Sequence, residues 1–84
     1  MNKLNAKLNF IIRELRADAR LVRAVQSRTY GCVNASIDGQ PIRLWLRDGQ
    51  ATALLIHRDH VPLAEAVRDA IGLRGCEIRT YEIG

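Results

Sequence analysis

Two Asp-Gly pairs in the middle of the chain constrain its fold more than any other feature of the sequence. They are Asp38-Gly39 and Asp48-Gly49, and each is followed by Gln. Type I′ turns need positive φ at both central residues, and Asp-Gly is one of the pairs that tolerates this. Both pairs are flanked by segments in which apolar and polar residues alternate, the pattern of a half-buried strand. The sequence therefore predicts a meander of three antiparallel strands.

The alternation also predicts how the first two strands pair. Closing the first turn by pairing Ile37 with Gln40 brings the apolar faces of both strands to the same side. In that register the opposed apolar pairs are Val33 with Leu44 and Ala35 with Ile42. Arg43, Trp45 and Arg47 then point to the opposite face of the sheet.

The second turn leaves two registers open. A two-residue loop at Asp48-Gly49 points Ala53 and Leu55 into the core. A three-residue loop that also includes Arg47 points the other set inward, namely Thr52, Leu54 and Ile56. We favour the three-residue loop, because it buries more apolar surface.

From Leu4 to about Gln26, apolar residues recur at spacings of three and four, which predicts one amphipathic helix. The apolar stripe comprises Leu4, Leu8, Ile11, Ile12, Leu15, Ala19 and Val22, and no Gly or Pro interrupts it. Such a helix is about 35 Å long at 1.5 Å per residue, more than a domain of this size needs to cover its core. We therefore expect residues 1–28 to form a long basic helix, part of which projects or meets a partner.

The rest of the chain completes a small α+β fold. Pro62 suits the first turn of a second helix, whose buried stripe runs from Leu63 to Ile71. A last strand is predicted from Cys76 to about Ile83. Because 84 residues can bury only one modest core, we predict a single domain over residues 1–84. Its expected order is α-β-β-β-α-β, with a mostly antiparallel four-stranded sheet, helices on one face, and residues 29–84 holding the sheet and the second helix.

The net charge of +4 is concentrated in residues 1–28, which contain seven Lys and Arg against two acidic residues. On a single helix, arginines spaced by three, four and three residues lie along one flank. We predict that this row binds nucleic-acid phosphates or an acidic partner. The alternative is an ordinary solvated basic flank. The row consists of Arg13, Arg16, Arg20 and Arg23.

Two further surfaces are candidates for binding a protein. Phe10 and Leu21 belong to a second, narrower apolar stripe on the predicted helix, which indicates a homodimer or a partner helix. The alternative is that the same domain wraps the helix on two sides. Trp45 lies between Arg43 and Arg47 on the outer sheet face, and Trp and Arg are enriched at interface hot spots. The alternative for Trp45 is a ring covered by Arg side-chain stems. We predict that all five of these residues bind a partner.

The sequence offers no catalytic, cofactor or metal signature. His57, Asp59 and His60 are clustered, but no further ligand follows at a convincing spacing. No apolar run is long enough to span a bilayer and no secretory signal is present, so we expect a cytoplasmic protein without a membrane partner or small-molecule substrate. We predict a non-enzymatic binding module of the inhibitor or adaptor type that phages and mobile elements carry, acting on a larger protein or nucleoprotein assembly. The alternative is a nucleic-acid-binding protein that uses the arginine row.

Overall fold

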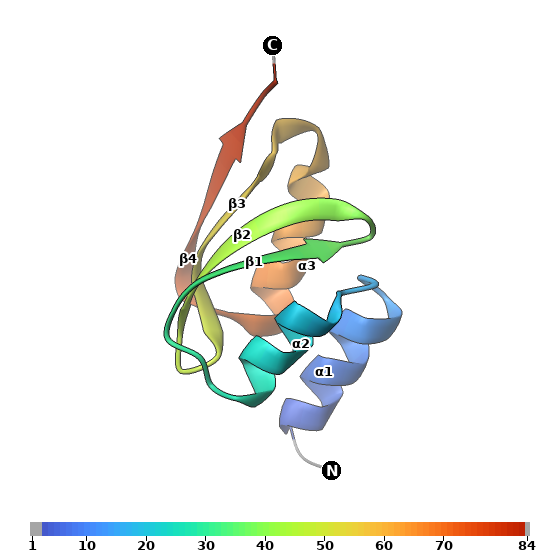
Figure 1. Cartoon of the computed structure of the whole chain (residues 1–84), viewed down its shortest axis with the longest axis vertical. Coiled ribbons are helices and arrows are strands. Elements are labelled where there is room, and N and C mark those ends of the chain that lie inside the picture. Colours follow the sequence, from blue (N-terminus) through green and yellow to red (C-terminus); the bar gives the residue numbers. More distant parts are fainter. Residues whose placement is uncertain (1–2, 84) are drawn as a thin grey trace.

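The computed structural model describes residues 3–83 and shows a small α+β domain in which helices pack on one side of a sheet (Figure 1). The predicted class and the order of elements hold in outline, with one more helix than expected. The helices are α1 (Lys3–Arg13), α2 (Ala19–Gln26) and α3 (Val61–Ile71), with a short 3-10 helix η1 (Arg58–His60) before α3. The strands are β1 (Gly31–Ile37), β2 (Gln40–Arg47), β3 (Gln50–His57) and β4 (Gly72–Tyr81).

The sheet is mixed and has the strand order β1-β2-β3-β4. β1 pairs with β2 and β2 with β3 in antiparallel fashion, whereas β4 runs parallel to β3. A parallel pair needs a long crossover, and α3 supplies it. The predicted register of the first hairpin is confirmed, since Ile37 pairs with Gln40 and Val33 with Leu44. β1 and β4 are the two edges of the sheet.

The three-residue loop favoured for the second turn is wrong. Asp48 and Gly49 have φ of 55° and 75°, and Arg47 pairs directly with Gln50, so the turn has two residues. Asp48 tolerates the left-handed region as Asp does in type I′ turns.

A bulge in β3 then turns Leu54 and Ile56 into the core, the direction that was expected from a three-residue loop. The register shifts between Trp45 and Leu46, so that Trp45 faces Ala53 although Leu46 faces Ala51. The additional residue is Thr52, whose hydroxyl donates to the Trp45 carbonyl oxygen at 3.1 Å. Beyond the bulge Leu54 and Ile56 point into the core and are fully buried.

The prediction of one continuous N-terminal helix is also wrong, because the structure has two separate helices there. α1 ends at Arg13, and the chain turns through Arg16, which adopts a left-handed φ of 49°. Asp18 then caps α2 by accepting the Leu21 N–H at 3.0 Å, and an Asp in this position replaces a missing intrahelical acceptor. Because of the turn, α2 packs beside α1 on the sheet instead of projecting from it (Figure 1).

The core lies between the helices and the inner face of the sheet. Of the stripe predicted on the first helix, Leu8, Ile11 and Leu15 are buried, but Ile12 is 47% exposed. The largest fully buried side chains are Ile11, Leu21, Ile37, Leu44, Leu54, Ile56, Val67 and Ile71. No helix within residues 3–83 has the length and apolar character needed to cross a membrane.

Candidate functional site

The outer face of the sheet gathers aromatic, apolar and basic side chains from different strands. All three α-helices lie on the opposite side of the sheet (Figure 1). The pairing of the strands places Asn34, Arg43, Leu55 and Arg79 in one row across this face. The neighbouring row consists of Cys32, Trp45, Ala53 and Glu77.

Trp45 is half-buried on this face beneath an arginine from another strand. The guanidinium carbon of Arg79 lies 5.1 Å from the centre of the Trp45 ring, within the range of a cation–π interaction. Arg79 also donates to a Glu77 carboxylate oxygen at 3.0 Å, and this hydrogen bond lowers the pKa of Glu77. The arginine cover considered for Trp45 therefore exists, but it comes from β4 and not from Arg43 or Arg47.

The five residues predicted to bind a partner do not form one surface. Arg43, Trp45 and Arg47 share the outer sheet face, as the alternation of β2 requires. Phe10 is 42% exposed on the helical side, where it lines a shallow hollow. Leu21 is fully buried in the core, so its assignment to a binding surface is wrong. Leu21 points into the core, and not to the predicted outer stripe, because the break before α2 rotates that helix relative to α1.

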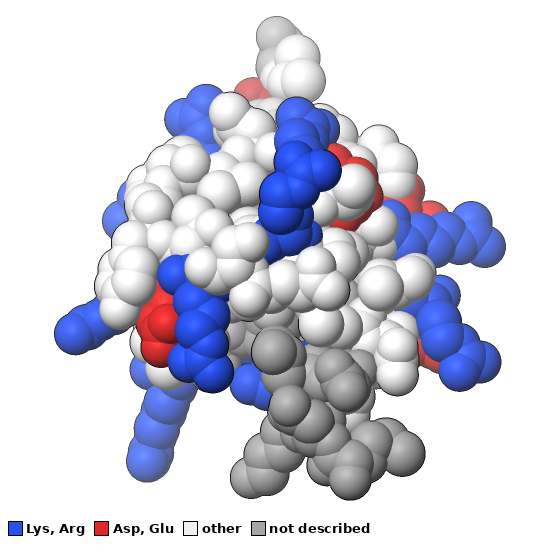
Figure 2. Space-filling view, turned by 60° about the horizontal axis from the view of Figure 1, so that its bottom comes forward, with Lys and Arg blue, Asp and Glu red and all other residues white. Residues whose placement is uncertain are grey.

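The arginine row is interrupted by the same break. Arg13 ends α1, Arg16 lies in the turn, and only Arg20 and Arg23 share a helix. Arg16 lies 3.7 Å from an Asp38 carboxylate oxygen, and Arg20 lies 3.0 Å from Asp18. Figure 2 shows Lys and Arg side chains standing apart around one end of the molecule, with uncharged surface between them. The four arginines therefore do not form the predicted continuous flank.

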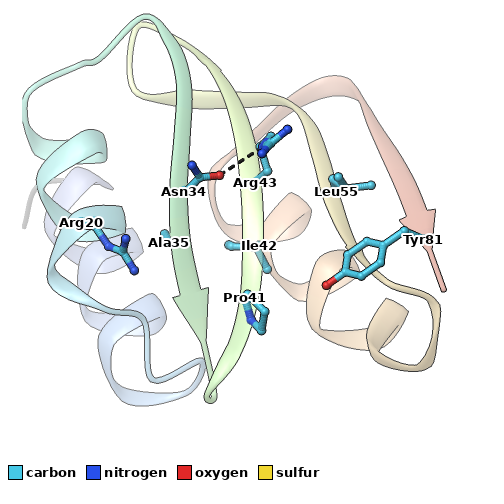
Figure 3. Close-up of a pocket in the computed structure, with 8 residues that line it drawn as sticks. All are labelled: Arg20, Asn34, Ala35, Pro41, Ile42, Arg43, Leu55 and Tyr81. Atoms are coloured by element: carbon cyan, nitrogen blue, oxygen red, sulfur yellow. Dashed lines mark hydrogen bonds between the residues drawn. The ribbon is translucent and has the colours of Figure 1, made fainter. Parts of the chain in front are cut away.

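A shallow hollow of about 480 Å³ crosses the outer face from β1 to β4 (Figure 3). Arg20 stands at its β1 end and Tyr81 at its β4 end, with Leu55 between them. Across the hollow, Arg43 Nε donates to Asn34 Oδ1 at 3.1 Å. This hydrogen bond draws the Arg43 side chain over β1.

The sequence did not predict that Arg79 and Tyr81 contribute to this face. Arg79 and Tyr81 are two positions apart in β4, so both lie on the same side of that strand. What the sequence lacked was the position of β4 beside β3, which places Arg79 opposite Leu55 and brings its guanidinium over the Trp45 ring of β2. Leu55 lies on the outer face as the favoured three-residue loop predicted, although the bulge at Thr52, and not the length of the turn, gives it that direction.

The histidine cluster is explained by local structure. His57 Nδ1 accepts the Asp59 N–H at 3.1 Å and so caps η1. The Tyr81 ring meets the His57 ring edge to face, with 5.5 Å between centroids. Within residues 3–83, no three His, Cys, Asp or Glu side chains are grouped closely enough to hold a metal ion.

The two cysteines are expected to differ in reactivity. Cys32 is exposed on β1, whereas Cys76 on β4 is buried, and burial raises the pKa of its thiol. The thiolate is the reactive form of cysteine. A thiol reagent should therefore label Cys32 rapidly in the native protein and label Cys76 only after denaturation. Mass spectrometry of digested protein identifies the labelled residue. Rapid native labelling of Cys76 would contradict its position in the core.

Comparison of the chain with protein-family models, with curated proteins and with solved structures found no match in any of the three.

Proposed function

We propose that this protein is a non-enzymatic binding module, of the inhibitor or adaptor type, that contacts a larger protein or nucleoprotein assembly through the outer face of its sheet. The observation that supports this proposal is that Trp45, Leu55 and Tyr81, from three strands, lie on the same face of the sheet, away from the helices. Arg43 and Arg79 lie among them. Such a mixture of aromatic, apolar and Arg side chains is typical of protein interfaces.

The geometry favours a protein partner over a nucleic acid. Arg16 and Arg20 each lie beside a carboxylate, so that a phosphate has to compete with Asp38 and Asp18 for them. Arg79 occupies one face of the Trp45 ring, which an unstacked base would otherwise use. A protein surface needs neither a continuous row of cations nor a free ring face.

The test of this proposal is affinity capture from a lysate of the organism that encodes the protein, followed by titration of the purified partner. Trp45→Ala should weaken binding about 30-fold or more, as truncation of an interface hot spot does. Phe10→Ala, on the helical side, is the matched control and should change affinity about twofold at most. Thermal unfolding of both variants establishes that they are folded.

Unchanged affinity in Trp45→Ala would refute the outer face as the binding surface. A second arm tests the nucleic-acid alternative by fluorescence anisotropy with labelled duplex DNA, single-stranded DNA and RNA. We expect no salt-sensitive binding at micromolar protein. Binding that weakens with salt and is lost when Arg13 and Arg23 are reversed to Glu would replace the proposal with the alternative.

A further inference from the structure

The β1 edge of the sheet has free backbone groups. In a two-residue hairpin the residues that flank the turn are hydrogen-bonded to each other, so Ile37 and every second residue before it face β2. The N–H and C=O groups of Cys32, Asn34 and Ser36 therefore point away from the sheet. Ser36 is already satisfied, because its N–H donates to Asp18 Oδ2 at 2.9 Å and its C=O accepts the Asp18 N–H at 3.0 Å.

Cys32 and Asn34 have no such cover. Within residues 3–83, no hydrogen bond is made by the outward backbone groups of these two residues. The loop that covers Ser36 reaches β1 only at its carboxyl end, where Ala17 bridges with Ile37. The amino-terminal half of β1 thus presents two donors and two acceptors in the geometry of an unpaired strand.

A hollow lies on each side of this open edge. On the helical side, a hollow of about 220 Å³ is lined by Arg23 and Arg20 of α2 together with Val33. On the outer side lies the larger hollow that contains Asn34 and Arg43 (Figure 3). Successive side chains of an added strand point to opposite faces of the sheet. Those of a segment paired with β1 would therefore enter these two hollows in turn.

The charges around the edge select the kind of segment that fits. Arg23 lies on one side and Arg43 on the other, and within residues 3–83 neither has a carboxylate within 4.0 Å. Arg20 forms an ion pair with Asp18, so the two together add no net charge. β1 itself contains no charged residue and no Pro to block pairing. Both flanks of the edge therefore favour carboxylates.

The same charges disfavour pairing of two copies through this edge. Antiparallel pairing of β1 with β1 of a second molecule would place the Arg23 and Arg43 side chains of both copies along one shared edge. Like charges gathered on one surface repel each other. An acidic segment of another protein has the opposite sign and faces no such repulsion.

We propose that the β1 edge at Cys32 and Asn34 takes an extended acidic segment of a partner protein as a fifth strand. Backbone groups of the segment pair with the free edge, and its carboxylates contact Arg23 on the helical side and Arg43 on the outer side. Adding a strand to an open edge is an established mode of peptide recognition. This inference rests on the proposed function, because it names the segment through which the partner reaches the face around Trp45.

The experiment uses a fluorescein-labelled peptide with blocked ends, Thr-Val-Thr-Glu-Glu-Thr-Val-Thr, in which the adjacent Glu side chains point to opposite faces. Anisotropy titrations with the full chain should show binding at least tenfold tighter than that of the same peptide with Gln in place of Glu. Reversal of both Arg23 and Arg43 to Glu should remove this preference. Arg74→Glu, at the other edge of the sheet, is the matched control and should retain it.

Hydrogen exchange followed by nuclear magnetic resonance separates strand pairing from charge attraction. The bound peptide should slow exchange of the Cys32 and Asn34 amides at least tenfold, and the fully N-methylated peptide should not. Equal binding of the Glu and Gln peptides, or Glu-dependent binding without protection of these amides, would overturn the inference. In either case loss of the partner in Trp45→Ala would still support the proposed function, so the two can fail separately.

Discussion

Replacing Gly49 with Ala is expected to destabilise the protein by about 3 kcal/mol, far more than the same change in the sister turn. A Cβ at position 49 would lie 2.7 Å from the Val25 carbonyl oxygen and 3.0 Å from Arg28 Cα, both of which are backbone atoms. The left-handed φ of 75° adds about 1 kcal/mol of strain for a residue with a side chain. Overpacking against atoms that cannot rotate away contributes about 1–3 kcal/mol more.

Gly39→Ala is the matched control. Gly39 occupies the same position in the first Asp-Gly turn with φ of 76°, but a Cβ there would meet nothing within 4 Å. Its expected cost is therefore the strain alone, about 1 kcal/mol. Thermal unfolding followed by circular dichroism should show Gly49→Ala melting at least about 10 °C below Gly39→Ala, given the usual scaling for domains of this size. Equal melting temperatures would mean that the end of α2 does not rest on the second turn.

The contrast between these turns shows what local sequence determines. The positions of both turns were predictable, because Asp-Gly pairs and alternating residues act within one hairpin, but the length predicted for the second turn was wrong. The burial of Gly49 was not, since it depends on the residues after α2, where the Gly49 N–H donates to the Thr29 carbonyl oxygen at 3.1 Å. The register of β1 and β2 followed from alternation for the same local reason, whereas the bulge at Thr52 did not.

The break between α1 and α2 shows a second limit. Its signal was present, because Asp18 is a good N-cap residue and lies three positions before Leu21. A continuous apolar stripe and the absence of Gly and Pro outweighed that signal. The turn is made by Arg16 in a conformation that non-Gly residues seldom adopt. It becomes favourable because Asp18 can then bind β1 as well as α2, a contact between segments that no spacing rule reveals.

The residues of the candidate site also fall into those that the sequence placed correctly and those that it did not. Arg43 and Trp45 were placed on the outer face by the alternation within β2. Leu21 was misplaced, since its burial depends on the angle between two helices, and Arg79 was missed, since its contact with Trp45 depends on which strand β4 joins. The alternation within β1 and β2 could be read from the sequence, whereas the bulge at Thr52 and the contacts that join distant segments could not.

Replacing Asp18 with Ala is expected to destabilise the protein by about 2–3 kcal/mol, from loss of the cap and of charge-assisted hydrogen bonds. One carboxylate oxygen accepts the Leu21 N–H, and the other accepts from Ser36 N–H and Oγ and from the Arg20 guanidinium. The side chain is only 24% exposed, so water cannot fully replace these partners. Urea unfolding measures the loss. Asp69→Asn, which removes an exposed carboxylate from α3, is the control and should change stability by about 0.5 kcal/mol at most.

Acid should remove the contribution that the Asp18 carboxylate makes to the free energy of unfolding. Burial on its own raises the pKa of this carboxyl, but the hydrogen bonds from Leu21, Arg20 and Ser36 outweigh burial and hold the pKa below its ordinary value of 3.8. The unfolded chain therefore takes up the proton first, and stability contributed by Asp18 is complete above the ordinary value and falls as the pH drops through the lower, folded-state pKa. Asp18→Asn cannot titrate at this position, so the difference in unfolding free energy between it and the native protein should stay constant from pH 7 to about pH 5 and shrink below about pH 4. A difference that stays constant down to about pH 2 would mean that Asp18 has the same pKa in the folded and unfolded chains, and the junction of α2 with β1 would then depend on its shape and not on its charge.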